Sequence, residues 1–509
     1  MSPARLSVDP AFVVGEVDPR LFGSFVEHLG RCVYTGIHEP GHPTADSFGF
    51  RGDVEALVRE LGTPVLRYPG GNFVSGYRWE DGVGPVADRP ARLDGAWKTT
   101  DPNTVGTDEF CAWTKRMGIE PVIAVNLGTR GVEAAAALVE YCNHPGGSAW
   151  SDMRAANGHP GPHGVKYWCL GNEMDGPWQI GHKTAQEYGR LAAEAAKAMR
   201  LVDPTIELVA CGSSGRWMPT FGEWETTVLD HTFDVVDHIS LHAYTSPTRD
   251  PGTGGGDDVA SFLASGVEFD SFIDGVVATV DAVAAKRHSS KKIGLSFDEW
   301  NVWHRYDGDE DGAWGLAPSL LECSYDLADA VVVGGMLISL LRHADRVKIG
   351  CLAQLVNVIA PIMTEPGGGS WVQPTFHPFA LTSRFGRGTV LNTPIASETM
   401  PTKAFGDVGA VDAVVVHSDP ATGGDGSLTV FAVNRDQSGP HTLTADLSGF
   451  PGLTTATVTV ISGDDPSATN TLDAPDTVTP QELPAAPLTD GALSVELPAV
   501  SWAMVRLTV

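Results

Sequence analysis

Short apolar runs alternate with amphipathic helical stretches from about Leu21 to Asn357. Eight runs have the length and composition of buried strands, and they cover residues 23–28, 64–70, 121–128, 165–173, 206–212, 238–244, 292–300 and 349–357. Between them lie segments with helical periodicity, among them 54–61, 107–117, 134–141, 185–201, 272–286 and 319–343. Eight strand-then-helix units predict an α/β fold with a (β/α)8 TIM barrel, which is favoured over an open doubly wound sheet.

The pattern changes after about Phe385. Residues 428–433, 454–461, 493–497 and 505–509 alternate Val, Leu or Ala with Thr, Ser or Glu, and turns rich in Gly, Pro and Asp separate them. This period of two predicts a C-terminal β-sandwich that resembles a jelly roll. Residues 6–10 precede the barrel and are expected to add a strand to the sandwich. We therefore expect a barrel over residues 19–384 and a sandwich made of residues 1–18 and 385–509.

Composition indicates what the chain does not bind. Its 34 Lys and Arg residues against 63 Asp and Glu residues give a formal charge of −29, which repels nucleic acid and anionic membranes. Seven cysteines are scattered without a C-x-x-C pair, which indicates free thiols in a reducing compartment. The N-terminus shows no apolar signal region, and the apolar stretch Ala330–Leu341 is too short to span a bilayer. We expect a cytoplasmic protein.

Polar residues gather where the predicted strands end. Active groups of such barrels lie at the C-terminal ends of the strands. The residues at those positions are Glu27, His28, Arg67, Asn72, Asn126, Asn172, Glu173, His242, Tyr244, Asp298, Glu299, Gln354 and Asn357. A barrel interior is otherwise apolar, so this set predicts a ligand site at one rim.

Two of these residues form the strongest candidate for chemistry. Glu173 and Glu299 end the fourth and seventh strands, on opposite sides of the predicted barrel mouth. One protonated and one ionised carboxyl are the minimum that glycoside hydrolysis requires, and in a retaining enzyme they lie about 5–5.5 Å apart. Asp298 is a rival to Glu299, but neighbours on a strand point to opposite faces, so only one should reach a sugar. Asp175 is a weaker rival to Glu173.

Several longer motifs occur in order along the chain: LFGSFVEHLGRCVYTGI, LRYPGGNFVSGYRWEDG, LGNEMDGPWQIG, ISLHAY and SFDEWNVWH. Together they resemble the family 51 α-L-arabinofuranosidases over about Leu21 to Gln373. The resemblance implies a retaining, exo-acting enzyme that releases terminal α-L-arabinofuranosyl residues from arabinan, arabinoxylan or derived oligosaccharides. It also implies that Glu173 is the general acid/base and Glu299 the nucleophile.

The same resemblance implies a subsite for the sugar ring. The residues it assigns to that subsite are Glu27, Asn72, Asn172, Tyr244 and Gln354. Asn172 would donate a hydrogen bond to the 2-hydroxyl of the sugar, and Tyr244 would hold Glu299. The glycines Gly70 and Gly71 would let the backbone approach the furanose closely.

Other side chains of the motifs have less direct expectations. Trp97 and Trp303 are expected on the leaving-group side, with Trp178 and Trp300 as further aromatic candidates. His242 is expected to support the site from behind. For Arg67 two interpretations stay open, since it either orients one of the glutamates or forms a structural ion pair.

The expected partners are arabinose-containing oligosaccharides. We expect no cofactor and no metal, because His182, His304 and His343 lack the spacing of metal ligands. The resemblance implies a homo-oligomer, often a hexamer. Two alternatives remain, an endo-acting β-glucanase or xylanase of the same clan and a non-catalytic sugar-binding protein. The acidic, aromatic segment 303–314 is either a substrate lid or a subunit contact.

Overall fold

The eight predicted strands close into a parallel barrel in a computed structural model of the chain, which describes residues 2–247, 258–304, 311–486, 488 and 491–508. The strands follow one another around the barrel in the order β10-β11-β12-β3-β4-β7-β8-β9. Their bounds are Gly23–Phe25 (β3), Val65–Tyr68 (β4), Glu120–Ala124 (β7), Tyr167–Leu170 (β8), Glu207–Ala210 (β9), His238–Thr245 (β10), Gly294–Val302 (β11) and Val347–Leu352 (β12). The barrel prediction is confirmed, although four of the predicted runs extend three or more residues beyond the C-terminal end of the strand.

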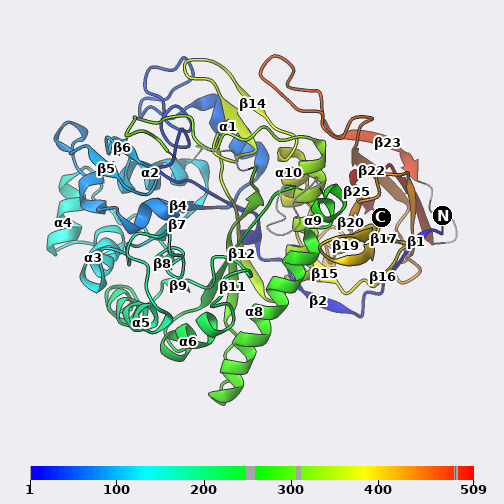
Figure 1. The fold of residues 1–509 in the computed structure, drawn as a ribbon, viewed down its shortest axis with the longest axis horizontal. Coiled ribbons are helices and arrows are strands. Elements are labelled where there is room, and N and C mark those ends of the chain that lie inside the picture. Colours follow the sequence, from blue (N-terminus) through cyan, green and yellow to red (C-terminus); the bar gives the residue numbers. More distant parts are fainter. Residues whose placement is uncertain (1, 248–257, 305–310, 487, 489–490, 509) are drawn as a thin grey trace.

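Helices surround the barrel (Figure 1). Their bounds are Gly52–Leu61 (α1), Thr107–Met117 (α2), Val132–Asn143 (α3), Ala149–Ala156 (α4), Ala185–Val202 (α5), Glu223–Thr232 (α6), Val259–Leu263 (α7), Gly266–Lys286 (α8), Leu327–Arg342 (α9) and Phe376–Phe385 (α10). The helix predicted over 319–343 begins too early, because Leu321 has φ 54° and Asp326 caps the first turn of α9 through the backbone N–H of Asp329. Helices α4, α6, α7 and α10 were not predicted.

Two β-sheets form the second region of the molecule. A seven-stranded sheet has the order β2-β15-β19-β20-β25-β22-β23, and a four-stranded sheet has the order β16-β1-β21-β24. Their strands are Ala4–Ser7 (β1), Val13–Glu16 (β2), Thr389–Leu391 (β15), Ile395–Ala396 (β16), Val411–His417 (β19), Leu428–Asn434 (β20), His441–Asp446 (β21), Thr455–Ile461 (β22), Gln481–Ala486 (β23), Ala492–Leu497 (β24) and Ser501–Thr508 (β25). Leu6, Leu443 and Val495 of the smaller sheet share one apolar core with Val430 and Val505 of the larger sheet, as in a sandwich.

The N-terminal residues contribute to both sheets. Strand β1 pairs with β21 and β16, and β2 pairs with β15 in the larger sheet. The sequence predicted one N-terminal strand and missed β2. Short two-stranded ribbons complete the chain: Arg92–Asp94 (β5) with Thr99–Asp101 (β6), Ile362–Thr364 (β13) with Ser370–Val372 (β14), and Thr399–Thr402 (β17) with Gly406–Gly409 (β18). The domain boundary at residues 384 and 385 stays a prediction.

Helix α9 lies between the barrel and the sandwich (Figure 1). Its apolar residues, which include the stretch 330–341, are almost all buried. A side chain at Gly334 would lie 2.1 Å from Cδ1 of Trp502 on β25, so only glycine permits this close approach. Burial between two domains explains an apolar helix in a chain whose described helices are all too short or too polar to cross a membrane.

Candidate active site

A pocket of about 330 Å³ lies at the C-terminal ends of the barrel strands. The residues that line it are Glu27, Leu29, Gly71, Asn72, Ala96, Trp97, Glu173, Trp178, Ser214, Trp217, Tyr244, Glu299, Trp303, Leu321, Gln354 and Ile359. The residues predicted for catalysis and sugar binding all belong to this set except Asn172 and His242, which are buried beside it. The other predicted strand-end residues do not line the pocket; they are His28, Arg67, Asn126, Asp298 and Asn357. The structure therefore brings the predicted residues together, while their individual roles stay predictions.

The positions of the two glutamates follow from the local backbone. Glu299 lies on β11, and Glu173 follows the end of β8 by three residues. Glu173 has φ 44°, a left-handed conformation that costs on the order of 1–3 kcal/mol for a residue other than glycine. Two contacts fix its carboxyl: Trp178 Nε1 donates to Oε2 at 2.6 Å, and His242 Nδ1 lies 2.9 Å from Oε1.

The carboxyl groups of Glu173 and Glu299 face each other across His242. A carboxylate oxygen from each and a ring nitrogen of His242 all lie within 4.8 Å of one another. Nδ1 of His242 lies 2.9 Å from Glu173 and 3.5 Å from Glu299, and Nε2 lies 3.1 Å from Asp298. Because both ring nitrogens meet carboxylates, the imidazole carries two protons. Burial by itself lowers the pKa of His242, but Glu299, Asp298 and Glu173 raise it to about 10.

Glu299 is held at both oxygens. Arg67 Nη1 donates to Oε1 at 2.6 Å, and the Tyr244 hydroxyl donates to Oε2 at 2.9 Å. Burial raises the pKa of Glu299, and the positive charges of His242 and Arg67 partly offset that rise. Arg67 and Tyr244 therefore fix the orientation of the Glu299 carboxyl group beside the pocket.

Arg67 satisfies both interpretations that the sequence left open. Besides Glu299, its Nε lies 3.5 Å from Asp298, and Nη2 donates to Asn172 Oδ1 at 2.6 Å. It therefore orients Glu299 and also forms a buried ion pair. Since Arg67 occupies the oxygen of Asn172, the Asn172 amide nitrogen is left for other partners, and it lies 3.5 Å from Asn72 Oδ1.

Asp298 and Glu299 do not point to opposite faces of β11, so that prediction was wrong. Strand β11 has a bulge, since Ser296 pairs with Ser240 but Glu299 pairs with His242, which places one extra residue on β11. Both carboxylates therefore reach His242 and Arg67 instead of pointing to opposite faces. Asp298 still does not line the pocket. It contacts Nε2 of His242, whereas Glu173 and Glu299 contact Nδ1 of the same ring. Arg67 and His242 outweigh burial and lower its pKa.

One end of the pocket, which we call the closed end, is built around Glu27. Trp97 Nε1 and the Phe73 backbone N–H donate to Glu27 Oε1 at 3.0 and 2.9 Å, and Gln354 Nε2 donates to Oε2 at 3.1 Å. Gln354 Oε1 accepts from the Glu27 backbone N–H at 3.2 Å. Burial, with a smaller effect of Glu299, raises the pKa of Glu27 to about 8.

Gly71 lies where the closed end meets the catalytic pair. An added Cβ would lie 3.0 Å from Glu27 Oε2 and 3.2 Å from Glu299 Oε1. A larger residue would therefore occupy space beside both carboxyl groups. Asn72, which lines the pocket, begins a short 3-10 helix, Asn72–Ser75.

The other end, which we call the open end, is formed by Trp178, Trp217 and Ser214. Trp178 and Trp217 are 43% and 56% exposed, and their rings lie 5.8 Å apart. The sequence named Trp178 only as a secondary candidate and missed Trp217 and Ser214, although the barrel rule on rim loops applies to the segment after β9 that carries them.

The aromatic predictions have different outcomes. Trp97 lines the pocket and donates to Glu27 at the closed end, and its role on the leaving-group side stays a prediction. Trp300 is fully buried and stacks on Phe379, so it belongs to the core. Trp303 lines the pocket and meets Tyr244 edge-on at 5.3 Å. Residues 305–310 of the segment predicted as lid or subunit contact lie outside the described residues.

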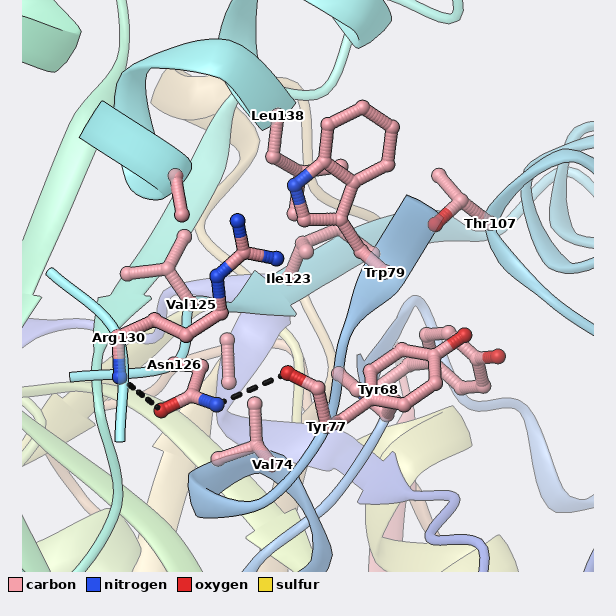
Figure 2. Close-up of a pocket in the computed structure, with 13 residues that line it drawn as sticks. Tyr68, Val74, Tyr77, Trp79, Thr107, Ile123, Val125, Asn126, Arg130 and Leu138 are labelled. Carbon is pink, nitrogen blue, oxygen red and sulfur yellow. Dashed lines mark hydrogen bonds between the residues drawn. The ribbon is translucent and has the colours of Figure 1, made fainter. Parts of the chain in front are cut away.

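Asn126, another predicted strand end, lies beside a different cavity. That cavity is about 20 Å³ and is lined by Tyr68, Val74, Trp79 and Leu138 among others, which is room for one or two waters. Figure 2 shows Asn126 donating to the Tyr77 carbonyl at 2.8 Å and accepting from the Arg130 backbone N–H. Asn126 thus holds a loop and does not reach the sugar pocket.

Ring nitrogens and carboxylates gather in two groups of the described residues. One is Glu173, His242 and Glu299, where Arg67 at 2.6 Å from Glu299 opposes a bound cation. The other is Asp108, His159 and His163, which lies outside the pocket. The histidines considered from sequence are elsewhere, since His304 and His343 pair with aspartates and His182 is exposed.

Comparison with known proteins assigns the fold and the pocket to a group of enzymes. Residues 57–256 match the model of the α-L-arabinofuranosidase 1 domain, and residues 298–501 match that of the α-L-arabinofuranosidase C-terminal domain. An intracellular exo-α-(1→5)-L-arabinofuranosidase of Streptomyces lividans is 56% identical over 99% of this chain and 75% of its own length. An exo-α-(1→6)-L-arabinofuranosidase of Bifidobacterium longum is 50% identical over 100% of this chain and 98% of its own length.

A solved structure agrees with these relatives. The family 51 α-L-arabinofuranosidase AbfB of Bifidobacterium longum superposes with a TM-score of 0.93 at 48% identity, and the match covers 100% of both chains. The likeness therefore extends over the barrel and the sandwich together.

Proposed function

The chain belongs to the α-L-arabinofuranosidases of glycoside hydrolase family 51, and from that premise we propose that it releases terminal α-L-arabinofuranosyl residues by a retaining double displacement. Glu299 acts as the nucleophile and Glu173 as the general acid and base. The observation that carries this proposal is the approach of the two carboxyl groups, whose nearest oxygens lie within 4.8 Å. Retaining enzymes separate the groups by about 5–5.5 Å, whereas inverting enzymes need about 6.5–9.5 Å for a water.

In the first step Glu299 attacks the anomeric carbon, and the bond from that carbon to the leaving oxygen breaks. The leaving oxygen takes the proton of Glu173, so an arabinosyl ester of Glu299 and a free alcohol are formed. Arg67 and Tyr244 hold Glu299 in position for attack. Trp178 and His242 hold Glu173.

In the second step Glu173, now ionised, takes a proton from water. The resulting hydroxide equivalent attacks the anomeric carbon, the ester bond breaks, and Glu299 leaves as a carboxylate. The two steps each invert the anomeric carbon, so the product has the configuration of the substrate. Asp298 stays paired with Nε2 of His242 and takes no direct part in either step.

The shape of the pocket supports exo cleavage. Glu27, Trp97 and Gln354 fill the closed end with a buried hydrogen-bonded group. A chain cannot continue past this end, so only a terminal residue enters the subsite. This argues against the endo-acting alternative, which requires an open cleft, and the catalytic pair argues against a non-catalytic sugar-binding protein.

We further propose arabinan-derived and arabinoxylan-derived oligosaccharides as substrates. The relatives carry (1→5) and (1→6) names at 56% and 50% identity, and the (1→5) linkage is the one we propose. The name of the Streptomyces lividans relative supports an intracellular location, where short oligosaccharides are available. A homo-oligomer also stays a proposal.

The test is methanolysis of 4-nitrophenyl α-L-arabinofuranoside, followed by NMR of the first product. Methyl α-L-arabinofuranoside is expected, and the methyl β-anomer would contradict a retaining mechanism. Glu299→Ala is expected to lower turnover by about four orders of magnitude or more. The 4-nitrophenyl β-D-xyloside and β-D-glucoside serve as controls, and preferential cleavage of either one would overturn the substrate assignment.

A further inference from the structure

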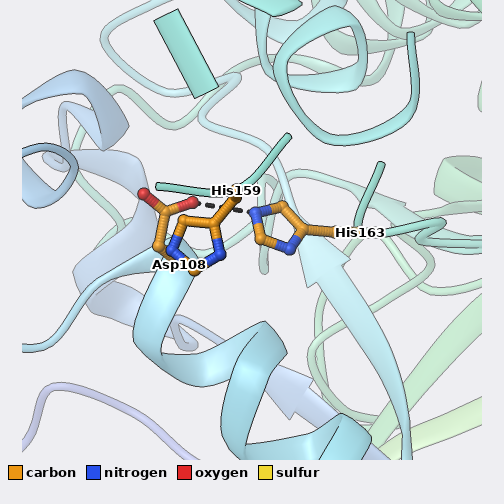
Figure 3. A group of neighbouring side chains, drawn as sticks. All are labelled: Asp108, His159 and His163. Atoms are coloured by element: carbon orange, nitrogen blue, oxygen red, sulfur yellow. Dashed lines mark hydrogen bonds and ion pairs between the residues drawn. The ribbon is translucent and has the colours of Figure 1, made fainter. Parts of the chain in front are cut away.

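Three metal-binding side chains meet on the outer side of the barrel, away from the pocket. Asp108 lies in the first turn of α2, and His159 and His163 lie in the segment between α4 and β8 (Figure 3). One ligand atom from each lies within 4.8 Å of the other two. We propose that these residues form a zinc site that fastens the segment before β8 to α2.

The geometry of the three groups fits zinc. Asp108 Oδ1 and His163 Nε2 are 2.8 Å apart, and the rings of His159 and His163 are 5.1 Å apart. Zinc bound at 2.0–2.1 Å in a tetrahedron separates its ligand atoms by roughly 3.3 Å. The separation of Asp108 Oδ1 and His163 Nε2 is below this value, and all three ligand atoms lie within 4.8 Å of one another, so side-chain shifts on the order of 1 Å complete the site.

The surrounding backbone is fixed, so only side chains need to move. The backbone N–H of His163 donates to the Cys142 carbonyl at 2.7 Å, and that of His159 donates to the Arg154 carbonyl at 3.1 Å. The buried Arg154 side chain donates back to the His159 carbonyl at 3.1 Å. Both histidines are thus presented from an ordered segment.

The second oxygen of Asp108 is already oriented. Tyr141 donates to Asp108 Oδ2 at 2.7 Å, and Asn157 Nδ2 donates to the Tyr141 hydroxyl at 3.0 Å. Such outer partners hold a ligating carboxylate in place. This leaves Oδ1 for the metal.

The two histidines differ in their existing contacts. The His163 side chain is 7% exposed and is paired with Asp108. Neither ring nitrogen of His159 forms a hydrogen bond with another residue in the described part of the chain, and its half-buried ring packs against His163. A structural ion pair explains His163 and Asp108, but it gives His159 no role. Zinc explains all three.

The donor set selects the ion. Two imidazole nitrogens and one carboxylate suit zinc, whereas calcium and magnesium prefer oxygen ligands. Water supplies the fourth ligand from the exposed side. On binding, two imidazole nitrogens and one carboxylate oxygen replace three water ligands of the zinc ion, so two Zn–N bonds and one Zn–O bond form as three Zn–water bonds break. The neutral His163 then carries its one ring hydrogen on Nδ1.

The experiment is titration of the tag-free, chelator-treated full-length enzyme with zinc chloride by calorimetry, with cobalt(II) as a spectroscopic probe. One equivalent of zinc is expected to bind at micromolar concentration, to raise Tm by about 2 °C or more, and to leave turnover of 4-nitrophenyl α-L-arabinofuranoside unchanged. Cobalt is expected to give the visible spectrum of a four-coordinate site.

Four variants distinguish zinc binding at Asp108, His159 and His163 from binding elsewhere on the protein. His159→Ala and Asp108→Asn are expected to abolish binding, while His182→Ala, which removes an exposed histidine, keeps it. Glu299→Gln, which disrupts the other candidate group, also keeps it. Absence of binding to the wild-type enzyme, or binding that survives His159→Ala, would overturn the proposal. Loss of binding in Glu299→Gln alone would place the metal in the pocket and overturn it too.

Discussion

The two ends of the pocket differ in the kind of residue that forms them. At the closed end both carboxylate oxygens of Glu27 accept hydrogen bonds from fixed partners, and the residue is 2% exposed. At the open end Trp178 and Trp217 present partly exposed rings. A site with buried hydrogen-bonding groups binds a ligand that leaves those groups unpaired far more weakly than one that pairs them. An aromatic surface binds many sugars, and each aromatic contact contributes only a modest free energy. Under the proposed function, this difference predicts strict recognition of the terminal sugar and loose recognition of the leaving group.

The largest expected effect comes from opening the closed end. Glu27→Ala leaves the Trp97 and Phe73 N–H groups and the Gln354 amide without their acceptor. We expect kcat/KM for 4-nitrophenyl α-L-arabinofuranoside to fall by about 10³-fold or more. Glu39→Ala, which removes a partner of Arg51 outside the pocket, is the control and should change little. A fall in kcat/KM of less than tenfold would show that the closed end does not recognise the sugar more strictly than the open end.

Tyr244→Phe tests whether the hydrogen bonds to Glu299 are as necessary for activity as those to Glu27 at the closed end. The change removes the hydroxyl that donates to Glu299 at 2.9 Å. Hydrogen bonds to charged groups contribute about 1.5–3 kcal/mol, so kcat should fall roughly 10- to 150-fold. Tyr34→Phe, which loses a hydrogen bond to Asp101 outside the pocket, serves as the matched control. If KM rises while kcat is unchanged, Tyr244 binds sugar without positioning Glu299.

Trp217→Ala tests the open end. Loss of one aromatic contact of about 0.5–1.5 kcal/mol predicts a rise in KM for arabino-oligosaccharides of roughly 2- to 12-fold. Aryl arabinofuranosides, which lack further sugar units, should be affected less. Steady-state kinetics on both substrate types checks this. An effect as large as that of Glu27→Ala would contradict loose recognition of the leaving group.

The smallest expected effect concerns stability and pH. Burial raises the pKa of Glu27 to about 8 in the folded protein. In the unfolded chain the carboxyl has an ordinary pKa of about 4.3, so it releases its proton at a lower pH. This contribution is complete below about pH 4 and is lost as the pH rises toward 8. Glu27→Gln should flatten the fall in Tm between pH 5 and 8 by a few degrees. An unchanged slope in thermal melts would show that Glu27 is ionised throughout.

The fold was predictable because its signals are repetitive. Eight apolar runs alternate with helices, and each predicted run overlaps one barrel strand. Helix α6 also carries a pattern, with Trp224, Val228 and Leu229 buried on one face, which the prediction overlooked. Strand β2 has only partly buried or exposed residues, so no apolar alternation marked it. Its place depends on pairing with β15, far away in the sequence.

The site was predictable where motifs lie at strand ends and less so where geometry is irregular. Glu173 and Glu299 were found because each lies near the C-terminal end of a predicted apolar run, within a motif that resembles those of the family. The bulge on β11 could not be inferred from alternation, which assumes regular pairing. The hydrogen bond from Trp97 to Glu27 was not predicted, because it joins residues 70 positions apart. Trp217 lies on an irregular rim segment that carries no period.

The most direct test of the account is to identify the residue that carries the sugar. Glu173→Ala slows the second step, so an activated aryl α-L-arabinofuranoside should leave the enzyme loaded with one arabinosyl unit. Rapid acid quench, proteolysis and mass spectrometry would locate the ester. The account predicts the adduct on Glu299. An adduct on Asp298, or none despite a burst of released aryl alcohol, would contradict it.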